Sequence, residues 1–302
     1  MPNTLTDRAR NALSRCDYFV DVQVWPPKDV LNPEGWLRNF LPAEEQVALR
    51  LLEGFTYFSG TLTNRLFVSA FHGLSSVMWR QAGGEPHEMW RRACDQMMVT
   101  YVEGEQPNPT DSGFAFARKA RQLVGIEEDS ILAPKDALAE LRANPRRPLV
   151  IVDDFVGSGK QFVSTWTREH TVAPDVKLSF DEHARNVGGS FYYIPLVCSD
   201  IGSRLLSQRC PQVIVAPAHQ LSRRDRALST ASRLWPPGMA EQARRVVETA
   251  SVRAGIPLDG PYGWRGFWKL GLTIAFEGSV PDATLPIFYW EQNGWIPLIR
   301  KA

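Results

Sequence analysis

The apolar positions of the chain first follow a helical period and later a strand-like one. Between about residues 35 and 103, apolar side chains recur at intervals of three and four, the spacing of a helix with one buried face. Two such stripes contain Trp36, Phe40, Val47, Phe71 and Met78. This spacing predicts a mainly helical N-terminal region over residues 1–103, before the turn-forming segment 104–113.

The middle of the chain alternates between predicted helices and short apolar runs. Helices are expected over 114–124, 135–142 and 202–209, and strand-like runs lie at 149–152, 190–197 and 212–216. Strands that alternate with helices favour βαβ units and a mainly parallel sheet. The predicted fold class is therefore α/β, with a core over residues 104–238. Residues 239–302 are expected to form a C-terminal, hood-like extension that packs on this core.

Composition and charge narrow the classes of function. The chain has 302 residues, of which 44% are hydrophobic, enough for a packed core. Its 34 basic and 33 acidic residues leave a net charge of +1. This balance argues against a protein that holds nucleic acid through a dense positive field, although a local basic patch remains possible.

The chain begins without the basic and apolar layout of a signal peptide, and no apolar run approaches the roughly 20 residues of a membrane span. Its cysteines and histidines show no metal-ligand spacing, so no metal site built by a protein cluster is expected. The four cysteines, which fit reduced thiols, are Cys16, Cys94, Cys198 and Cys210. These features predict a cytoplasmic protein with no membrane partner.

The segment 149–161 contains the strongest chemical signal. Four apolar residues lead to Asp153 and Asp154, which fall where ligands bind in open parallel sheets, beyond the carboxyl end of a strand. Glycines then allow backbone N–H groups to approach an anion, and a helix that starts near residue 160 adds its N-terminal dipole. The predicted phosphate-binding residues are Gly157, Ser158, Gly159, Lys160 and Gln161. Carboxylates repel a phosphate but accept hydrogen bonds from a ribose diol.

Two other motifs do not fit this segment. A Walker A loop requires glycine at position 154 and a hydroxyl residue at 161, where the chain has Asp154 and Gln161. A nucleophile elbow around Ser158 requires glycine at positions 156 and 160, where the chain has Val156 and Lys160. An ordinary strand-to-helix turn with chance aspartates remains an alternative.

The segment resembles the ribose-phosphate motif of type I phosphoribosyltransferases. The resemblance implies that Asp153 and Asp154 act in catalysis by holding the ribose hydroxyls of phosphoribosyl pyrophosphate (PRPP), while residues 157–161 enclose the 5-phosphate. Phe155 stands where the family has an aliphatic residue, and Gly157 and Gln161 stand where it has serine or threonine. These departures remove hydroxyl donors but keep the backbone donors.

The wider chain resembles the phosphoribosyltransferase-like (PRTase-CE) family of bacterial conflict systems. Three blocks carry this resemblance, at residues 110–121, 152–166 and 281–300. It implies an effector in antiphage defence that acts on nucleotides or nucleic acid, with a possible partner protein from a defence operon. A non-catalytic sensor of a ribose-phosphate or nucleotide-like ligand, acting through a partner, is the alternative.

Three further segments admit two interpretations each. Residues 110–113 either cap a helix or form a pyrophosphate loop, in which Ser112 and Gly113 donate and Arg118 neutralises charge. Mg²⁺ would then be bound largely by substrate oxygens. The arginines of 223–233 form either a solvated face or a contact with nucleic acid or an acceptor nucleotide. Residues 281–295 form either a hood over the site or a core segment.

Overall fold

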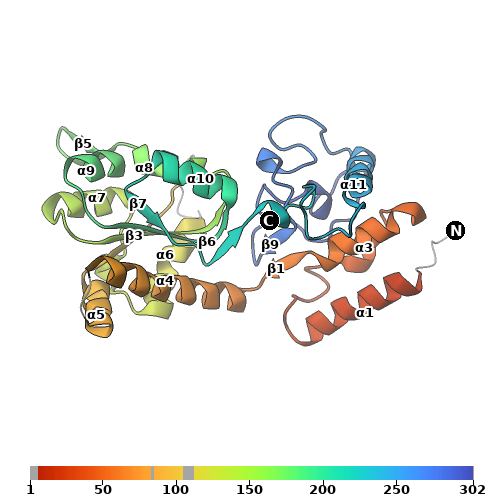
Figure 1. The fold of residues 1–302 in the computed structure, drawn as a ribbon, viewed down its shortest axis with the longest axis horizontal. Helices are drawn as coiled ribbons and strands as arrows, with labels where there is room; N and C mark the ends of the chain where they lie inside the picture. Colours follow the sequence, from red (N-terminus) through yellow and green to blue (C-terminus); the bar gives the residue numbers. More distant parts are fainter. Residues whose placement is uncertain (1–5, 83–84, 105–111, 302) are drawn as a thin grey trace. The chain divides into compact units, whose positions relative to one another are not determined.

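The computed structural model describes residues 6–82, 85–104 and 112–301. The chain forms two compact units (Figure 1). Unit 1 combines residues 1–63 with 222–302, and unit 2 is the uninterrupted stretch 64–221. No helix of the described ranges is long and apolar enough to cross a membrane.

Unit 2 is built on a parallel sheet. Its strands are β2 (Met98–Tyr101), β3 (Leu149–Val156), β6 (Phe191–Ser199), β7 (Val213–Val215) and β8 (His219–Leu221). They follow the order β2-β3-β6-β7, with β8 also pairing with β6, and every pairing is parallel. β6 is buried along its whole length, as expected for a strand covered on both faces. The predicted α/β class with a parallel sheet is confirmed.

Helices cover both faces of this sheet (Figure 1). They are α4 (Gly60–Ala82), α5 (Pro86–Gln96), α6 (Ser112–Lys119), α7 (Pro134–Ala143), α8 (Lys160–Thr167), α9 (Phe180–Asn186) and α10 (Asp200–Arg209). A hairpin of β4 (His170–Ala173) and β5 (Val176–Leu178) lies between α8 and α9. Residues of α7, α8 and α9 share one hydrophobic cluster with Leu149 and Ile151 of β3. In Figure 1, α8 and α10 lie on one face of the sheet, and α4 and α6 lie on the other.

The two chain connections that follow β2 run to opposite sides of this strand. After β2 and α6, the chain returns to the outer edge of β2, where Ile131 bridges Val99 in parallel. It then crosses through α7 to β3 on the opposite side of β2. Such a reversal is a topological switch point, and the crevice between the two strand ends is where open α/β sheets bind ligands.

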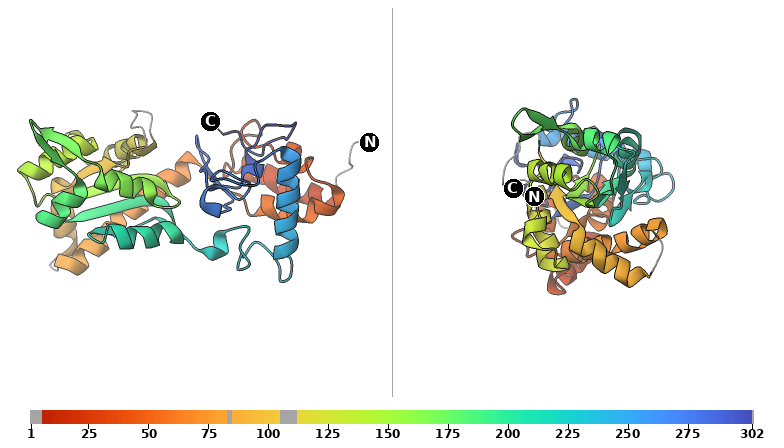
Figure 2. Two further views of the ribbon diagram at one scale, coloured as in Figure 1. Left: turned by 90° about the horizontal axis from the view of Figure 1, so that it is seen from above. Right: turned by 90° about the vertical axis from the view of Figure 1, so that its left-hand side faces the viewer.

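Unit 1 has its own core. Its elements are α1 (Asp7–Asp21), α2 (Pro33–Leu37), α3 (Glu45–Glu53), β1 (Thr56–Phe58), α11 (Ala240–Ala254) and β9 (Ile274–Phe276). α11 is the long blue helix of Figure 2. β1 pairs in parallel with β9, more than 200 residues later in the chain. Trp36 stacks on Phe288 at 5.2 Å between ring centroids, and its indole N–H donates to the carbonyl of Ile287 at 2.8 Å.

The unit boundaries correct the predicted division into residues 1–103, 104–238 and 239–302. Residues 64–103 belong with the parallel sheet, because β2 is one of its strands. Residues 222–302 share a hydrophobic core with the N-terminal helices. Ile287, Phe288 and Trp295 are buried in that core, which favours the core interpretation of residues 281–295.

Candidate functional site

The two predicted acids lie inside the end of β3 rather than after it. β3 extends to Val156, so Asp153 and Asp154 keep the strand's alternation and their side chains point to opposite faces. They stand beside the end of β2, where the backbone N–H of Val102 donates to the carbonyl of Val152 at 3.3 Å. The pair therefore borders the switch-point crevice between β2 and β3.

Asp153 is buried and its carboxylate is already engaged. Its side chain is 5% exposed, and Oδ2 accepts a hydrogen bond from the hydroxyl of Tyr193 at 2.7 Å. Oδ1 accepts one from the backbone N–H of Asp154 at 2.9 Å. Burial, followed by the charge of Asp154, raises the pKa of Asp153 well above its usual value. The prediction that both acids hold ribose hydroxyls therefore requires Asp153 to give up a hydrogen bond within the protein.

Asp154 is the more accessible acid. It is half-buried, and its Oδ1 accepts a hydrogen bond from the backbone N–H of Phe155 at 2.7 Å. By alternation along β3 it lies on the face of the sheet that α6 covers, since Asp153 points to the α8 face with Tyr193. Of the two predicted acids, Asp154 is thus the one in a position to meet a ligand in the crevice.

The loop that follows β3 is held tightly against α10. Gly159 has φ +81°, a left-handed conformation that favours glycine, and a Cβ there would lie 3.2 Å from the carbonyl oxygen of Gly202. A Cβ on Gly202 would lie 2.9 Å from the carbonyl oxygen of Gly157. Ser199 caps α10 by accepting from the N–H of Gly202, and its hydroxyl donates to the carbonyl of Gly157. Two glycines and one serine therefore fix the path of the loop.

The backbone donors of this loop are available to an anion. Among the described residues, none accepts a hydrogen bond from the N–H groups of Gly157, Ser158, Gly159 or Gln161. α8 begins at Lys160, so the positive end of its dipole faces the same place. The five predicted phosphate-binding residues therefore form a continuous strand-loop-helix turn with the chemistry of an anion site.

A cluster beside the loop was missed by sequence reasoning. Glu103 follows β2 and is buried, and its Oε2 accepts from the guanidinium of Arg168 at 3.0 Å. Arg168 also donates to the carbonyl of Gly104 at 3.1 Å, and buried Thr165 of α8 bonds both backbone groups of Glu103. Burial lowers the pKa of nearby His170 despite the Glu103 carboxylate. The cluster fixes the end of β2 against α8. Sequence reasoning could not find it, because Glu103 and Arg168 are far apart in the chain and belong to common residue types.

The predicted pyrophosphate residues lie on α6. The helix starts at Ser112, and a Cβ on Gly113 would lie 2.6 Å from the carbonyl oxygen of Val102, so the start of α6 packs on the end of β2. Thr110 and Asp111 lie outside the described residues. Arg118 lies further along α6 and lines a cavity of about 580 Å³ together with Phe114, Arg121 and Glu128. The N-terminal ends of α6 and α8 thus flank the same crevice.

No group of three metal-binding side chains was found among the described residues. Asp154 offers one half-buried carboxylate, which fits a Mg²⁺ ion whose other ligands are oxygens of its substrate.

Comparison with known proteins agrees with this geometry. A search of curated proteins found no match. A family model, PRTase-CE, matches residues 33–301 and so spans both units. The match includes the parallel sheet, the loop after β3 and the C-terminal segments of unit 1. The chain therefore belongs to the PRTase-CE family, with a phosphoribosyltransferase-like fold.

Proposed function

We propose that the protein is a phosphoribosyltransferase-like enzyme that binds PRPP or a related ribose 5-phosphate at the end of β3. The observation that supports this most directly is the set of backbone N–H groups at Gly157, Ser158, Gly159 and Gln161, for which no described residue is an acceptor, beside the half-buried Asp154. Backbone donors at a helix start suit a phosphate, and a neighbouring carboxylate suits a sugar hydroxyl. Membership of the PRTase-CE family supports the same class of ligand.

In the proposed complex each segment has one task. The loop 157–161 binds the 5-phosphate, and Asp154 accepts a hydrogen bond from a ribose hydroxyl. Asp153 is a positioning residue, because its bonds to Tyr193 and to the N–H of Asp154 hold the end of β3 in place. Ser112, Gly113 and Arg118 are proposed to bind the pyrophosphate from the α6 side, with Mg²⁺ carried by the substrate. The anomeric carbon would lose pyrophosphate and be attacked by an acceptor, and positioning lowers the barrier of such a step.

Binding and turnover can be measured separately. Titration calorimetry with PRPP and with ribose 5-phosphate tests the phosphate site, and release of pyrophosphate in the presence of nucleobases, nucleotides or nucleic acid tests transfer. Asp154→Asn should lower the rate of pyrophosphate release by roughly a hundredfold or more, because the ribose loses its anchor. Asp175→Asn is the matched control, since this exposed acid lies in the β4–β5 turn, outside the site. A folded wild-type protein that binds neither ligand would refute the proposal.

The second candidate function is that of a sensor that binds the ligand without turnover. The hydrogen bonds and the raised pKa of Asp153 support this candidate. Both oxygens of Asp153 accept hydrogen bonds within the protein and its pKa is raised, so a ribose would have to displace these bonds to be held by both acids. A sensor should bind PRPP without releasing pyrophosphate, and binding should change its association with a partner protein. Release of pyrophosphate that Asp154→Asn abolishes would exclude it.

The proposed biological role is that of an effector in antiphage defence, supported by the family. Phage should form fewer plaques on a lawn of cells that carry the gene with its neighbours than on a lawn of cells that carry Asp154→Asn in the same operon. Equal protection from the two alleles would separate any defence role from this site.

A further inference from the structure

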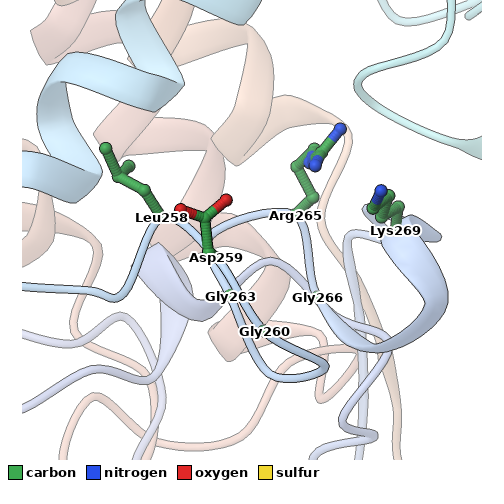
Figure 3. Close-up of a pocket in the computed structure, with 7 residues that line it drawn as sticks. All are labelled: Leu258, Asp259, Gly260, Gly263, Arg265, Gly266 and Lys269. Carbon is green, nitrogen blue, oxygen red and sulfur yellow. The ribbon is translucent and has the colours of Figure 1, made fainter.

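A second pocket lies in unit 1, within the loop that follows α11. It has a volume of about 290 Å³ and is lined by residues of the segment 258–269. Its charged side chains are Asp259, Arg265 and Lys269, and Gly260, Gly263 and Gly266 also line it. Figure 3 shows Arg265 and Lys269 next to each other at one end of the pocket, with Asp259 nearer the other end.

The two cations lack protein counter-ions. Within the part of the chain that the structure describes, neither Arg265 nor Lys269 forms an ion pair with a carboxylate. The guanidinium of Arg265 lies 5.6 Å from the ring centroid of Trp264, whose own side chain is buried. This cation–π contact restrains Arg265 without neutralising it. The pocket therefore presents two positive charges against the single carboxylate of Asp259.

The backbone around Lys269 is strained. Trp268 and Lys269 both have φ +56°, so two consecutive residues that are not glycine adopt the left-handed region. Hydrogen bonds on each side hold this conformation, from the N–H of Lys269 to the carbonyl of Gly266 at 2.9 Å and from the N–H of Gly271 to the carbonyl of Arg265 at 2.8 Å. Strained backbone that the surroundings enforce is concentrated at ligand-binding positions. Here it places Lys269 beside Arg265.

We propose that this pocket binds a phosphate monoester that carries hydroxyl groups, of the size of a sugar phosphate. Two unpaired cations match the two negative charges of a phosphate monoester. Asp259 repels the phosphate but accepts a hydrogen bond from a hydroxyl, which orients the ligand. The volume lies at the lower end of the range for small-molecule sites and suits one sugar ring with its phosphate. All lining residues belong to unit 1, so this site is additional to the loop of the proposed function.

Equilibrium dialysis of the full chain with labelled ribose 5-phosphate tests the proposal. Arg265→Gln with Lys269→Gln should remove one bound ligand per chain, or weaken that site by roughly tenfold or more for each cation. Arg244→Gln is the matched control, because Arg244 also lies over the ring of Trp264, at 5.9 Å, but does not line the pocket. The control variant should bind as the wild type does.

The stoichiometry separates this proposal from the proposed function. Two bound ligands, of which the double variant loses one, support both sites. One bound ligand that the double variant loses supports the pocket alone and counts against the loop. Binding that the double variant leaves unchanged overturns the pocket, whatever the loop does.

The role of Asp259 has a test of its own. Asp259→Ala should strengthen the binding of inorganic phosphate to the pocket, because a repulsive charge is removed, and should weaken that of ribose 5-phosphate relative to phosphate. A ratio of the two affinities that does not change would exclude a hydroxyl contact at Asp259.

Discussion

The hydroxyl of Tyr193 donates a hydrogen bond to Oδ2 of Asp153 at 2.7 Å, in the interior of unit 2. The ring of Tyr193 also stacks on Phe162 of α8 at 4.0 Å between centroids. One side chain thus joins β6, the acid of β3 and the helix that follows the phosphate loop. Asp153 is held as part of the core, whereas its neighbour Asp154 is only half-buried.

The stability of the protein should depend on the ionisation of Asp153. Its pKa is raised in the folded state above the unfolded value of about 3.9, chiefly by burial, so the folded state binds the proton more tightly. The contribution of protonated Asp153 to the free energy of unfolding is therefore fully present below about pH 4 and is lost as the pH rises toward the folded pKa. Asp153→Asn should remove this decline in the free energy of unfolding, which amounts to at most about 1.4 kcal/mol per pH unit. Urea unfolding at several pH values measures it, and Asp175→Asn should follow the wild type.

Gly159→Ala should weaken phosphate binding as well as stability. Gly125 has the same φ of +81°, but a Cβ there meets nothing within 4 Å, whereas at Gly159 it meets the backbone of Gly202. Gly125→Ala should cost about 1 kcal/mol from backbone conformation alone. Gly159→Ala should cost more and lower the affinity for ribose 5-phosphate. Equal effects of the two substitutions in unfolding and calorimetry would contradict the close approach.

Ser199→Ala should lower the free energy of unfolding by more than the loss of one helix cap. Ser199 caps α10 and also donates to Gly157, whereas Ser179 caps α9 by accepting from the N–H of Glu182 at 3.1 Å. Ser179→Ala should cost about 1 kcal/mol of unfolding free energy. Ser199→Ala should cost roughly 1–3 kcal/mol more, because the carbonyl of Gly157 loses its donor. Similar losses for both would show that the second bond adds nothing.

Arg118→Ala should lower the affinity for PRPP by roughly tenfold or more and leave ribose 5-phosphate unaffected, because only PRPP carries a pyrophosphate. Arg121→Ala is the control, since Arg121 lines the same cavity but is paired with Glu128 at 2.8 Å. Calorimetry with both ligands measures the effect. An unchanged affinity for PRPP in the Arg118 variant would remove this residue from the proposed pyrophosphate site.

Local patterns predicted the elements around the phosphate loop well. The run 149–152 lies within β3, and the predicted helix 202–209 lies within α10. These segments were readable because a continuous apolar run and an amphipathic period leave a local signature. The sequence also placed the turn at 157–159, where glycine permits the observed φ.

Long-range pairings were not readable in the same way. The four residues of β2 were assigned to a helical region, because a short strand flanked by apolar helices has no distinct period. The partner of β1 lies in the last part of the chain, and nothing in either segment specifies the other. Asp153 was expected to face a ligand because the strand was predicted to end before it. In the structure it is buried and bonded to Tyr193, forty residues away, which no local pattern indicates.

Unit 1 is built from two separate stretches of the chain, so it can fold only after unit 2 has been synthesised. Unit 2 occupies one stretch of chain and can complete its sheet as soon as residue 221 has left the ribosome. Trp36 emerges much earlier, yet its stacking partner Phe288 lies 252 residues further along the chain. Until Phe288 has been translated, the helices around Trp36 therefore carry an apolar surface without its cover, and this is the segment of the nascent chain that most needs a chaperone.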